Sequence, residues 1–325
     1  MLRGALPDVL IIHSTSLPTL PDATPPITAD SSPAAKAAPS DLRLRLIWGV
    51  IGAVLLLGSV WFSPFTFGLF FAFVQAVMLW EFYRMMRAGG YAPSGSIGIV
   101  TSIVAFGTVG FTALYKPGEH SLDTPDMMVL MGLIMIGGLI LLLPVAVLIR
   151  EMILWPKHKN PFGNVGVTLL GFFYVTLPML MLLIISISNK TGYDYRRVFG
   201  LLFLVWASDI GAYAVGRTFG KHKLAPKISP GKTWEGWAGG FAITLLVGWA
   251  IGFMLPDMPL LHRLVAAGVV AVFAPLGDLA ESMLKRSVGV KDSGSIMPGH
   301  GGLLDRFDAF LLVLPVLALL QLLAG

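Results

Sequence analysis

Long apolar stretches follow one another along most of this chain, and short polar stretches separate them. From Leu42 onward, these stretches come close to the roughly 20 residues that an α-helix needs to cross a bilayer. Pro, Gly and charged residues gather in the breaks between them. The pattern predicts an all-α integral membrane protein, a polytopic bundle of about nine transmembrane helices. Their expected bounds are 44–62, 65–84, 95–115, 126–149, 164–187, 198–217, 234–255, 260–284 and 303–323.

Residues 1–40 have a different composition. They are rich in Pro, Ala, Ser and Thr and have no periodic apolar pattern, which is typical of a disordered segment. A signal peptide is the alternative, but the apolar run from Val9 to Ile12 is too short for its hydrophobic core. We therefore expect a disordered tail at 1–40 and a polytopic membrane domain at 41–325.

The composition supports the membrane class and excludes several others. With 55% hydrophobic residues and a mean hydropathy of +0.79, the chain is too apolar for an ordinary globular domain. The absence of cysteine excludes a disulfide framework, a Cys-ligated zinc site and a thiol nucleophile. The net charge of +5 is weak evidence for nucleic acid, because no basic helix or RNA motif accompanies it. We expect no nucleic-acid partner.

The distribution of Lys and Arg orients the predicted spans. Cytoplasmic loops of membrane proteins carry an excess of these residues. With the N-terminus in the cytoplasm, and with Arg3 and Lys36 of the tail and Arg306 at the start of a span left out, fifteen basic residues lie on the cytoplasmic side and five on the other. The prediction is therefore a multi-pass protein of the inner (cytoplasmic) membrane, with its charged loops facing the cytoplasm, where nucleotides are found.

Ionisable residues crowd into 277–310, although only 13% of the chain is charged. Such a group at bilayer depth costs at least about 2.5 kcal/mol, so a function is its default explanation. Residues three or four apart share a helix face. One polar stripe near the end of the eighth span therefore consists of Asp278, Glu281, Ser282 and Lys285, and Asp305 and Asp308 make a second stripe in the ninth.

Carboxylates that converge without enough basic partners repel one another unless a cation lies between them. Hard oxygen ligands of this kind suit Mg²⁺, which also takes water and substrate phosphate oxygens. The alternative is a set of helix-end salt bridges with Lys285, Arg286 and Arg306, since structural charge pairs inside membranes do occur.

The turn between these spans is rich in glycine. Pro298, Gly299, His300, Gly301 and Gly302 lead directly into a helix, where backbone N–H groups favour an anion. Alone, such a turn is more often a tight connection. Beside Lys285, Arg286 and Lys291 it becomes a candidate polyphosphate cradle. His300 is a base, a phosphate hydrogen-bond donor or a turn residue, and the sequence slightly favours the donor.

A second polar cluster lies upstream, at 206–236. Asp209 lies inside an apolar span, which is costly and therefore suggests a function. A P-loop at Gly231-Lys232-Thr233 is rejected, because that motif needs Gly where this chain has Pro226. What remains is a basic loop suited to an anionic headgroup or nucleotide phosphates, formed by Lys227, Ser229, Lys232 and Thr233. For Gly216, Gly220, Gly236 and Gly240 we expect close helix packing.

Together the two clusters resemble the bacterial-type phosphatidate cytidylyltransferases (CDP-diacylglycerol synthases). The resemblance covers roughly 42–325 and is most specific over 206–308, the expected catalytic region. Met297 departs from the family pattern but is apolar. The C-terminal signature is matched by Ser282, Lys285, Arg286, Lys291, Asp292, Gly294, Pro298, His300, Gly301, Gly302, Asp305, Arg306, Phe307 and Asp308, and the upstream block by 208–213 and 224–236.

The resemblance implies that CTP and phosphatidate react to give CDP-diacylglycerol and pyrophosphate at the membrane lipid bilayer. It also implies a divalent metal, Mg²⁺, held by Asp278 and Asp305, and it allows a second cation beside it. A homodimer is a further expectation. The expected catalytic residues are Asp278, Lys285, Arg286, His300, Asp305 and Asp308. The expected substrate-binding residues are Asp209, Lys227, Ser229, Lys232, Thr233, Ser282, Lys291, Asp292, Gly301, Gly302 and Arg306.

Two other functions stay open at this point. A CTP-dependent lipid kinase of the polyprenol type has a related signature but transfers the γ-phosphoryl group. A transporter would also place charge in its spans, but it predicts polar residues near mid-depth in two repeated halves. Here they gather at one membrane face of the C-terminal half, and no internal repeat is visible.

Overall fold

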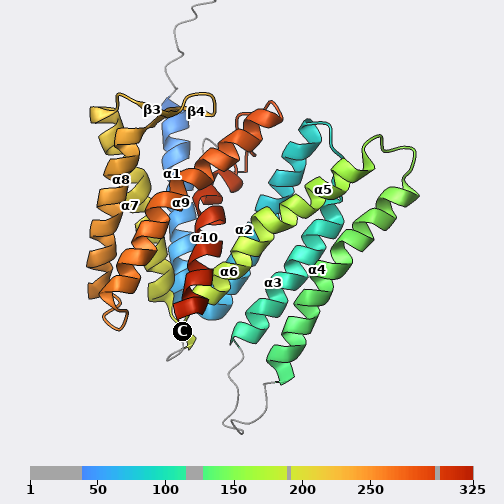
Figure 1. The fold of residues 1–325 in the computed structure, drawn as a ribbon, viewed down its shortest axis with the longest axis horizontal. Coiled ribbons are helices and arrows are strands. Elements are labelled where there is room, and N and C mark those ends of the chain that lie inside the picture. Colours follow the sequence, from blue (N-terminus) through green and yellow to red (C-terminus); the bar gives the residue numbers. More distant parts are fainter. Residues whose placement is uncertain (1–38, 115–126, 189–191, 297–300, 325) are drawn as a thin grey trace, which may run out of the picture. The chain divides into compact units, whose positions relative to one another are not determined.

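The computed structural model describes residues 39–114, 127–188, 192–296 and 301–324. The expected tail, apart from its last two residues, lies outside this range, and its disorder stays a prediction. Helix is the dominant element (Figure 1). The helices are α1 (Pro39–Phe62), α2 (Pro64–Ala88), α3 (Gly95–Leu114), α4 (Met127–Ile153), α5 (Pro161–Gly171), α6 (Leu177–Ile185), α7 (Tyr195–Phe219), α8 (Trp234–Ala250), α9 (Leu260–Ser287) and α10 (Leu304–Ala324).

Each predicted apolar stretch corresponds to a helix or to a continuous run of helical turns. The fifth stretch is α5, a π-helical turn (η1, Phe172–Thr176) and α6 in succession, and a 3₁₀ turn (η2, Ile251–Phe253) extends α8. Seven of these runs are long and apolar enough to cross a membrane. Of the other two, α1 has a shorter apolar part at 46–62, and α10 carries Asp305, Arg306 and Asp308 in its first turns. The chain is an all-α polytopic membrane protein, as predicted.

Successive helical runs alternate in direction (Figure 1). The ends of α2, α4, α7 and α9 therefore lie at the same end of the bundle as the starts of α3, α5, α8 and α10. We call this the loop end. Several helices run past their apolar stretches here: α2 reaches Ala88 rather than residue 84, and α4 reaches Ile153 rather than residue 149. Polar residues can continue a helix beyond the apolar stretch, and long basic side chains such as Arg84 and Arg87 extend toward water.

Polar caps explain where four of the helices begin. Ser63 caps α2 in a capping box with Thr66, and Pro64 occupies the first turn. Asn160, Asp194 and Thr233 cap α5, α7 and α8, each accepting a hydrogen bond from a backbone N–H of the first turn. Such caps satisfy N–H groups that have no partner within the helix. The polar breaks between apolar stretches therefore also set the helix boundaries.

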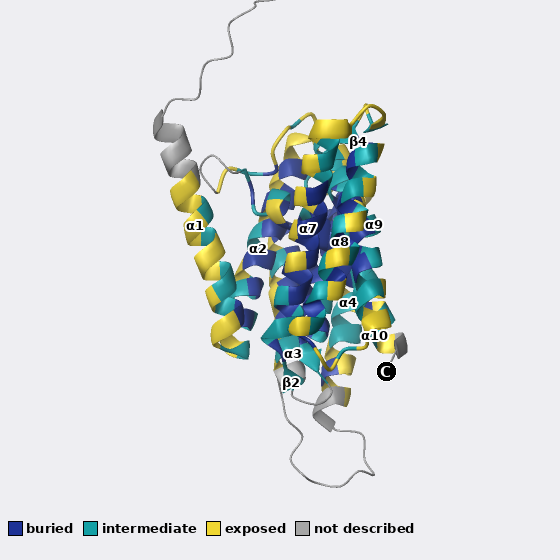
Figure 2. Cartoon of the chain, turned by 90° about the vertical axis from the view of Figure 1, so that its left-hand side faces the viewer, coloured by how far each residue is buried: buried dark blue, intermediate teal, exposed yellow. Residues whose placement is uncertain are grey.

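The core lies between α2, α6, α7, α9 and α10. Buried residues fill the middle of the bundle, whereas α1 is mostly exposed (Figure 2). Helices α7 and α8 approach most closely at glycines. A Cβ atom added at Gly236 would lie 2.7 Å from the Ala212 carbonyl oxygen, and one at Gly240 would lie 2.7 Å from the Ser208 carbonyl oxygen. The predicted packing role of Gly216, Gly236 and Gly240 is confirmed. Gly220 instead follows α7 as its C-cap and lies against the Thr233 side chain.

Two short antiparallel hairpins interrupt the helical pattern. One pairs β1 (Ile187–Ser188) with β2 (Gly192–Tyr193), and the other pairs β3 (Lys223–Ala225) with β4 (Ser229–Thr233). In the second hairpin Lys223 faces Thr233 and Ala225 faces Ser229. The sequence predicted only a basic loop there. The hairpin lies at the loop end and leads directly into α8 (Figure 1).

Candidate active site

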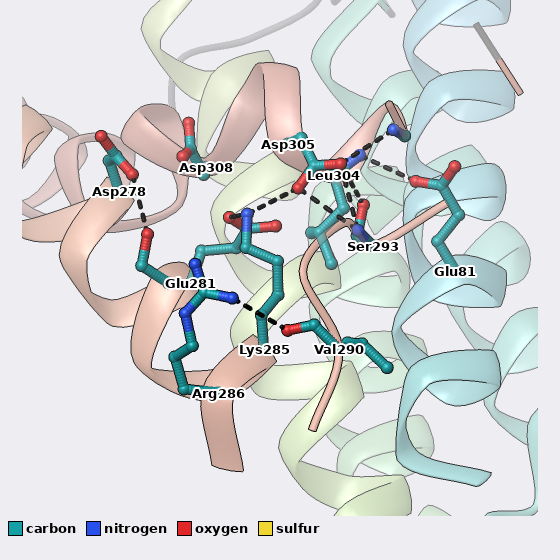
Figure 3. Close-up of polar contacts among 12 residues, drawn as sticks. Glu81, Asp278, Glu281, Lys285, Arg286, Val290, Ser293, Leu304, Asp305 and Asp308 are labelled. Carbon is teal, nitrogen blue, oxygen red and sulfur yellow. Dashed lines mark hydrogen bonds and ion pairs between the residues drawn. The ribbon is translucent and has the colours of Figure 1, made fainter. Parts of the chain in front are cut away.

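The candidate site is built where the last turns of α9 meet the first turn of α10. Lys285 lies at its centre (Figure 3). Its Nζ atom is 2.5 Å from Glu281 Oε2, one helical turn earlier, and 2.7 Å from Asp305 Oδ1 on α10. The Glu281 side chain is fully buried, and those of Lys285 and Asp305 are 12% and 11% exposed. This is a nearly dry cluster of two carboxylates and one ammonium group.

The second oxygen of Asp305 organises the chain on either side of 297–300. Asp305 Oδ2 accepts hydrogen bonds from the backbone N–H of Ser293 (3.1 Å), the Ser293 hydroxyl (3.0 Å) and the backbone N–H of Gly302 (2.8 Å). Two glycines make this approach feasible. Gly301 has φ +80°, and a Cβ atom at Gly302 would collide with the Ser293 hydroxyl. The Gly302 amide, expected to bind phosphate, is thus engaged by Asp305.

Asp278 forms a separate and more open group. Its Oδ2 atom is 2.6 Å from Lys232 Nζ, and its Oδ1 atom accepts a hydrogen bond from the Ser282 hydroxyl at 3.2 Å. The Asp278 side chain is 41% exposed. Lys232 comes from β4 and also donates to the Pro275 carbonyl at 3.0 Å. The hairpin therefore delivers a lysine to the carboxylate on α9.

The proline inside α9 helps to attach α8 beside this group. Because Pro275 has no N–H, the carbonyl of Ala271 loses its usual partner in the helix. The indole N–H of Trp237, on α8, donates to that carbonyl at 2.9 Å. The carbonyl that the proline leaves without an intrahelical partner thus accepts a hydrogen bond from the neighbouring helix, close to where Lys232 contacts α9.

Two further carboxylates lie near Asp278. Asp308 on α10 is beside it (Figure 3), and the charges of Asp278 and Asp209, on α7, both act on Asp308. Helices α9 and α10 are very close here, because a Cβ atom at Gly277 would lie 2.6 Å from the Asp308 carbonyl oxygen. Acidic groups from α7, α9 and α10 thus converge near Lys232.

Carboxylate oxygens in this arrangement have the donor chemistry that Mg²⁺ prefers. Within the described residues, however, no three His, Asp or Glu side chains are already arranged as a metal site. Asp305 is occupied by Lys285, Ser293 and Gly302, and Asp278 is paired with Lys232. The shared cation at Asp278 and Asp305 stays a prediction, and binding it would require both carboxylates to exchange partners.

The other expected residues are spread over the loop end. Arg286 donates to the Val290 carbonyl at 3.4 Å. The Thr233 hydroxyl accepts from the Gly236 N–H and caps α8, which is a structural role. His300 lies outside the described residues. The exposed residues are Asp209, Lys227, Arg286, Lys291, Asp292 and Arg306, while Ser229, Ser282 and Gly301 are half-buried.

Two residues of this region were not found from the sequence. Glu81, on α2, is fully buried, and its Oε2 atom accepts a hydrogen bond from the Leu304 N–H at 2.9 Å. Tyr174, in the π-helical turn, has a buried hydroxyl without a hydrogen-bond partner among the described residues, and the charges of Glu281, Asp308 and Asp278 act on it. The sequence did contain a signal for Glu81, because it is an ionisable residue inside an apolar span.

Comparisons with known proteins identify the family of this chain. A model of the cytidylyltransferase family matches residues 43–323. The phosphatidate cytidylyltransferase of Bacillus subtilis (strain 168) is 35% identical over 279 residues, which are 85% of this chain and 96% of the relative. That of Haemophilus influenzae is 33% identical over 291 residues, 82% of this chain and 95% of the relative. That of Staphylococcus saprophyticus is 41% identical over 165 residues, 50% of this chain and 62% of the relative.

Proposed function

Because the chain belongs to the cytidylyltransferase family, we propose that it transfers a cytidylyl group from CTP to phosphatidate, forming CDP-diacylglycerol and pyrophosphate for phospholipid synthesis. It is a nucleotidyltransferase embedded in a membrane. One observation of the structure carries the proposal: carboxylates from α9 and α10 pair with Lys232 and Lys285 at one end of the bundle, with Asp209 of α7 close enough for its charge to act on Asp308. That end is where a lipid headgroup and a water-soluble nucleotide can meet.

The reaction requires mainly electrostatic stabilisation. A phosphate monoester carries nearly two negative charges near neutral pH, so an oxygen of phosphatidate needs no general base to attack. It forms a bond to the α-phosphorus of CTP, and the bond from that phosphorus to the bridging oxygen of pyrophosphate breaks. The barrier is the approach of one anion to another. Positioning and cationic groups therefore account for most of the catalysis.

The lysines of the site suit this task. Lys232 is held by a partly exposed carboxylate and a backbone carbonyl, so a phosphate can compete for it. Lys285 is buried between two carboxylates and holds the α9–α10 junction together. We propose that Lys232 contacts substrate phosphates directly. Among the residues with polar or charged side chains at the loop end, Lys227, Ser229, Arg286, Lys291 and Arg306 are candidates for the outer phosphates.

Mg²⁺ is the expected cofactor, with Asp278 and Asp305 as its proposed ligands and a second cation allowed beside it. The oxygen donors fit the metal, and the acidic excess around Asp278 favours a cation there. A bound Mg²⁺ would neutralise phosphate charge. Asp308 is a further carboxylate next to Asp278 (Figure 3). His300 remains a proposed hydrogen-bond donor to a substrate phosphate.

We propose that the loop end faces the cytoplasm at the inner membrane. The supporting observation is the excess of basic residues, fifteen against five, on the side where these loops lie. CTP is then available on that face. A homodimer remains a proposal about the partners of the chain.

The activity is tested with two labelled nucleotides. Membranes containing the protein are incubated with phosphatidate and with either α-labelled or γ-labelled CTP. If label enters lipid from α-labelled CTP and not from γ-labelled CTP, the result supports cytidylyl transfer. Label that enters from the γ position only indicates a lipid kinase and contradicts the proposal. Membranes with an Asp278→Asn variant provide the matched background.

A further inference from the structure

We propose that Glu81 is a positioning residue of the active site: it holds the start of α10, and through it Asp305, in the geometry needed for transfer. This inference rests on the proposed function. Glu81 lies on α2, which contributes none of the residues predicted for the site. Its carboxylate nevertheless reaches the loop that carries them (Figure 3).

The contact between Glu81 and α10 is a hydrogen bond to a backbone group that has no partner within the helix. The first N–H groups of any helix lack intrahelical acceptors, and a residue at the helix start usually supplies one. Here Glu81 Oε2 accepts from Leu304 N–H at 2.9 Å, across 223 residues of sequence. Helix α2 thus provides the cap for α10.

The loop is fitted around this carboxylate at two glycines. A Cβ atom at Gly302 would lie 2.6 Å from Glu81 Oε2, and one at Gly294 would collide with Glu81 Oε1. Backbone from both sides of the segment 295–301 therefore approaches the same buried side chain. Burial of an ionised group is costly without compensation. If the side chain at position 81 only filled space, an apolar residue would therefore be more favourable there.

The contact between Glu81 and Leu304 affects the active site through Asp305. It follows Leu304 directly, and its carboxylate pairs with Lys285 and holds Ser293 and Gly302. If Leu304 shifts, the Asp305 carboxylate shifts with it. Loss of the Glu81 contact should therefore slow the transfer step more than it weakens substrate binding.

The first test measures the loop without substrate. The chain has no cysteine, so a single cysteine at the exposed residue Ser295 can carry a spin label in detergent. Glu81→Leu, which keeps the volume but removes the acceptor, should increase the mobility of that label. Glu81→Gln keeps an acceptor for Leu304 and should restore wild-type mobility. A label at Lys223 on β3 is the control and should not respond to either variant.

The second test separates positioning from folding. For gel-filtered protein, Glu81→Leu should lower kcat about 100-fold, the scale of a misplacement of about 1 Å, with KM for CTP changed far less. Glu81→Gln should recover most of the rate. Wild-type label mobility in Glu81→Leu, or a Glu81→Gln variant as slow as Glu81→Leu, overturns the inference.

A variant on the loop side covers the case in which Glu81→Leu does not fold. Gly294→Ala keeps the acid and adds a methyl group whose three nearest neighbours are all atoms of Glu81, among them Oε1, with which it would collide. It should raise label mobility at position 295 and lower kcat, and failure to do either overturns the inference. Because the mobility of the label needs no substrate, an enzyme that proves not to transfer cytidylyl groups would refute the proposed function and leave this measurement intact.

Discussion

Replacing Asp278 and Asp305 by Asn should have different consequences, although the two residues are predicted to hold the same metal ion. Asp305 accepts hydrogen bonds from the Lys285 ammonium group, the Ser293 N–H and hydroxyl, and the Gly302 N–H. An amide has one accepting and one donating end. In either orientation of an Asn at 305, its NH₂ group faces a donor. Asp278 is partly exposed, and its side-chain partners within the described part of the chain are Lys232 and Ser282.

These contacts set the expected loss of stability. Breaking a buried ion pair by removing one partner costs about 3–5 kcal/mol. Because Lys285 retains Glu281, we expect Asp305→Asn to cost about 3 kcal/mol, roughly a hundredfold in the ratio of folded to unfolded protein. Asp278→Asn should cost less than about 1 kcal/mol, as for other exposed pairs. Its effect should instead be on turnover, with a loss of about 100-fold or more if it holds charge-stabilising Mg²⁺.

Two measurements on detergent-purified protein separate these effects. One is the free energy of unfolding by denaturant titration, and the other is turnover per folded molecule at increasing Mg²⁺. Asp257→Asn, at an exposed position before α9, is the matched control and should change neither. An Asp305→Asn variant as stable as wild type would refute the hydrogen-bond network assigned to Asp305. Near-normal turnover of Asp278→Asn would remove that residue from the metal site.

Three further predictions concern regions outside the α9–α10 junction. Single cysteines at the exposed positions Lys223 and Ser295 should resist a membrane-impermeant thiol reagent in intact cells, and labelling without lysis would reverse the proposed orientation. Deletion of residues 1–38 should leave specific activity within a few-fold, and loss of activity in an inserted, truncated protein would contradict this. Burial would raise the pKa of Asp194, but hydrogen bonds from Arg196 hold that pKa below its ordinary value. The resulting stabilisation is therefore complete above about pH 4 and is lost as the pH falls through the lower folded pKa. Denaturant titrations between pH 2 and 5 should show a weaker pH dependence for Asp194→Asn than for wild type.

The helices and their close contacts could be predicted because their signals are local. An apolar stretch identifies its own span, and glycines four residues apart, such as Gly236 and Gly240, indicate a packing face. Which helices meet depends on contacts between residues far apart in sequence. The pairing of Lys232 with Asp278 crosses 46 residues, and that of Glu81 with Leu304 crosses 223. Periodicity carries no information on such pairs.

The types of residue in the candidate site were therefore predicted, but the pairs that they form were not. The stripe formed by Asp278, Glu281 and Lys285 follows from helix spacing, and the ion pair between Glu281 and Lys285 confirms it. Salt bridges with Lys285 were the alternative to a metal site, and the pair between Lys285 and Asp305 is such a bridge. The sequence did not reveal which carboxylates Lys285 would bind. Nor did it reveal that Asp305 holds Gly302, because an aspartate at a helix start has both local and distant donors within reach.

The double attachment at Asp305 has a consequence for how this region can change during evolution. Ser293 and Gly302 are both fixed to one carboxylate, so the chain between them is a closed loop with its ends pinned at a single point. Doubling the length of such a loop adds only about 0.6 kcal/mol of closure entropy. Insertions between the two anchors should leave the Asp305 carboxylate where it is, whereas a single residue inserted between Gly302 and Asp305 would detach it. Length variation among functional sequences should accordingly stop at Gly302.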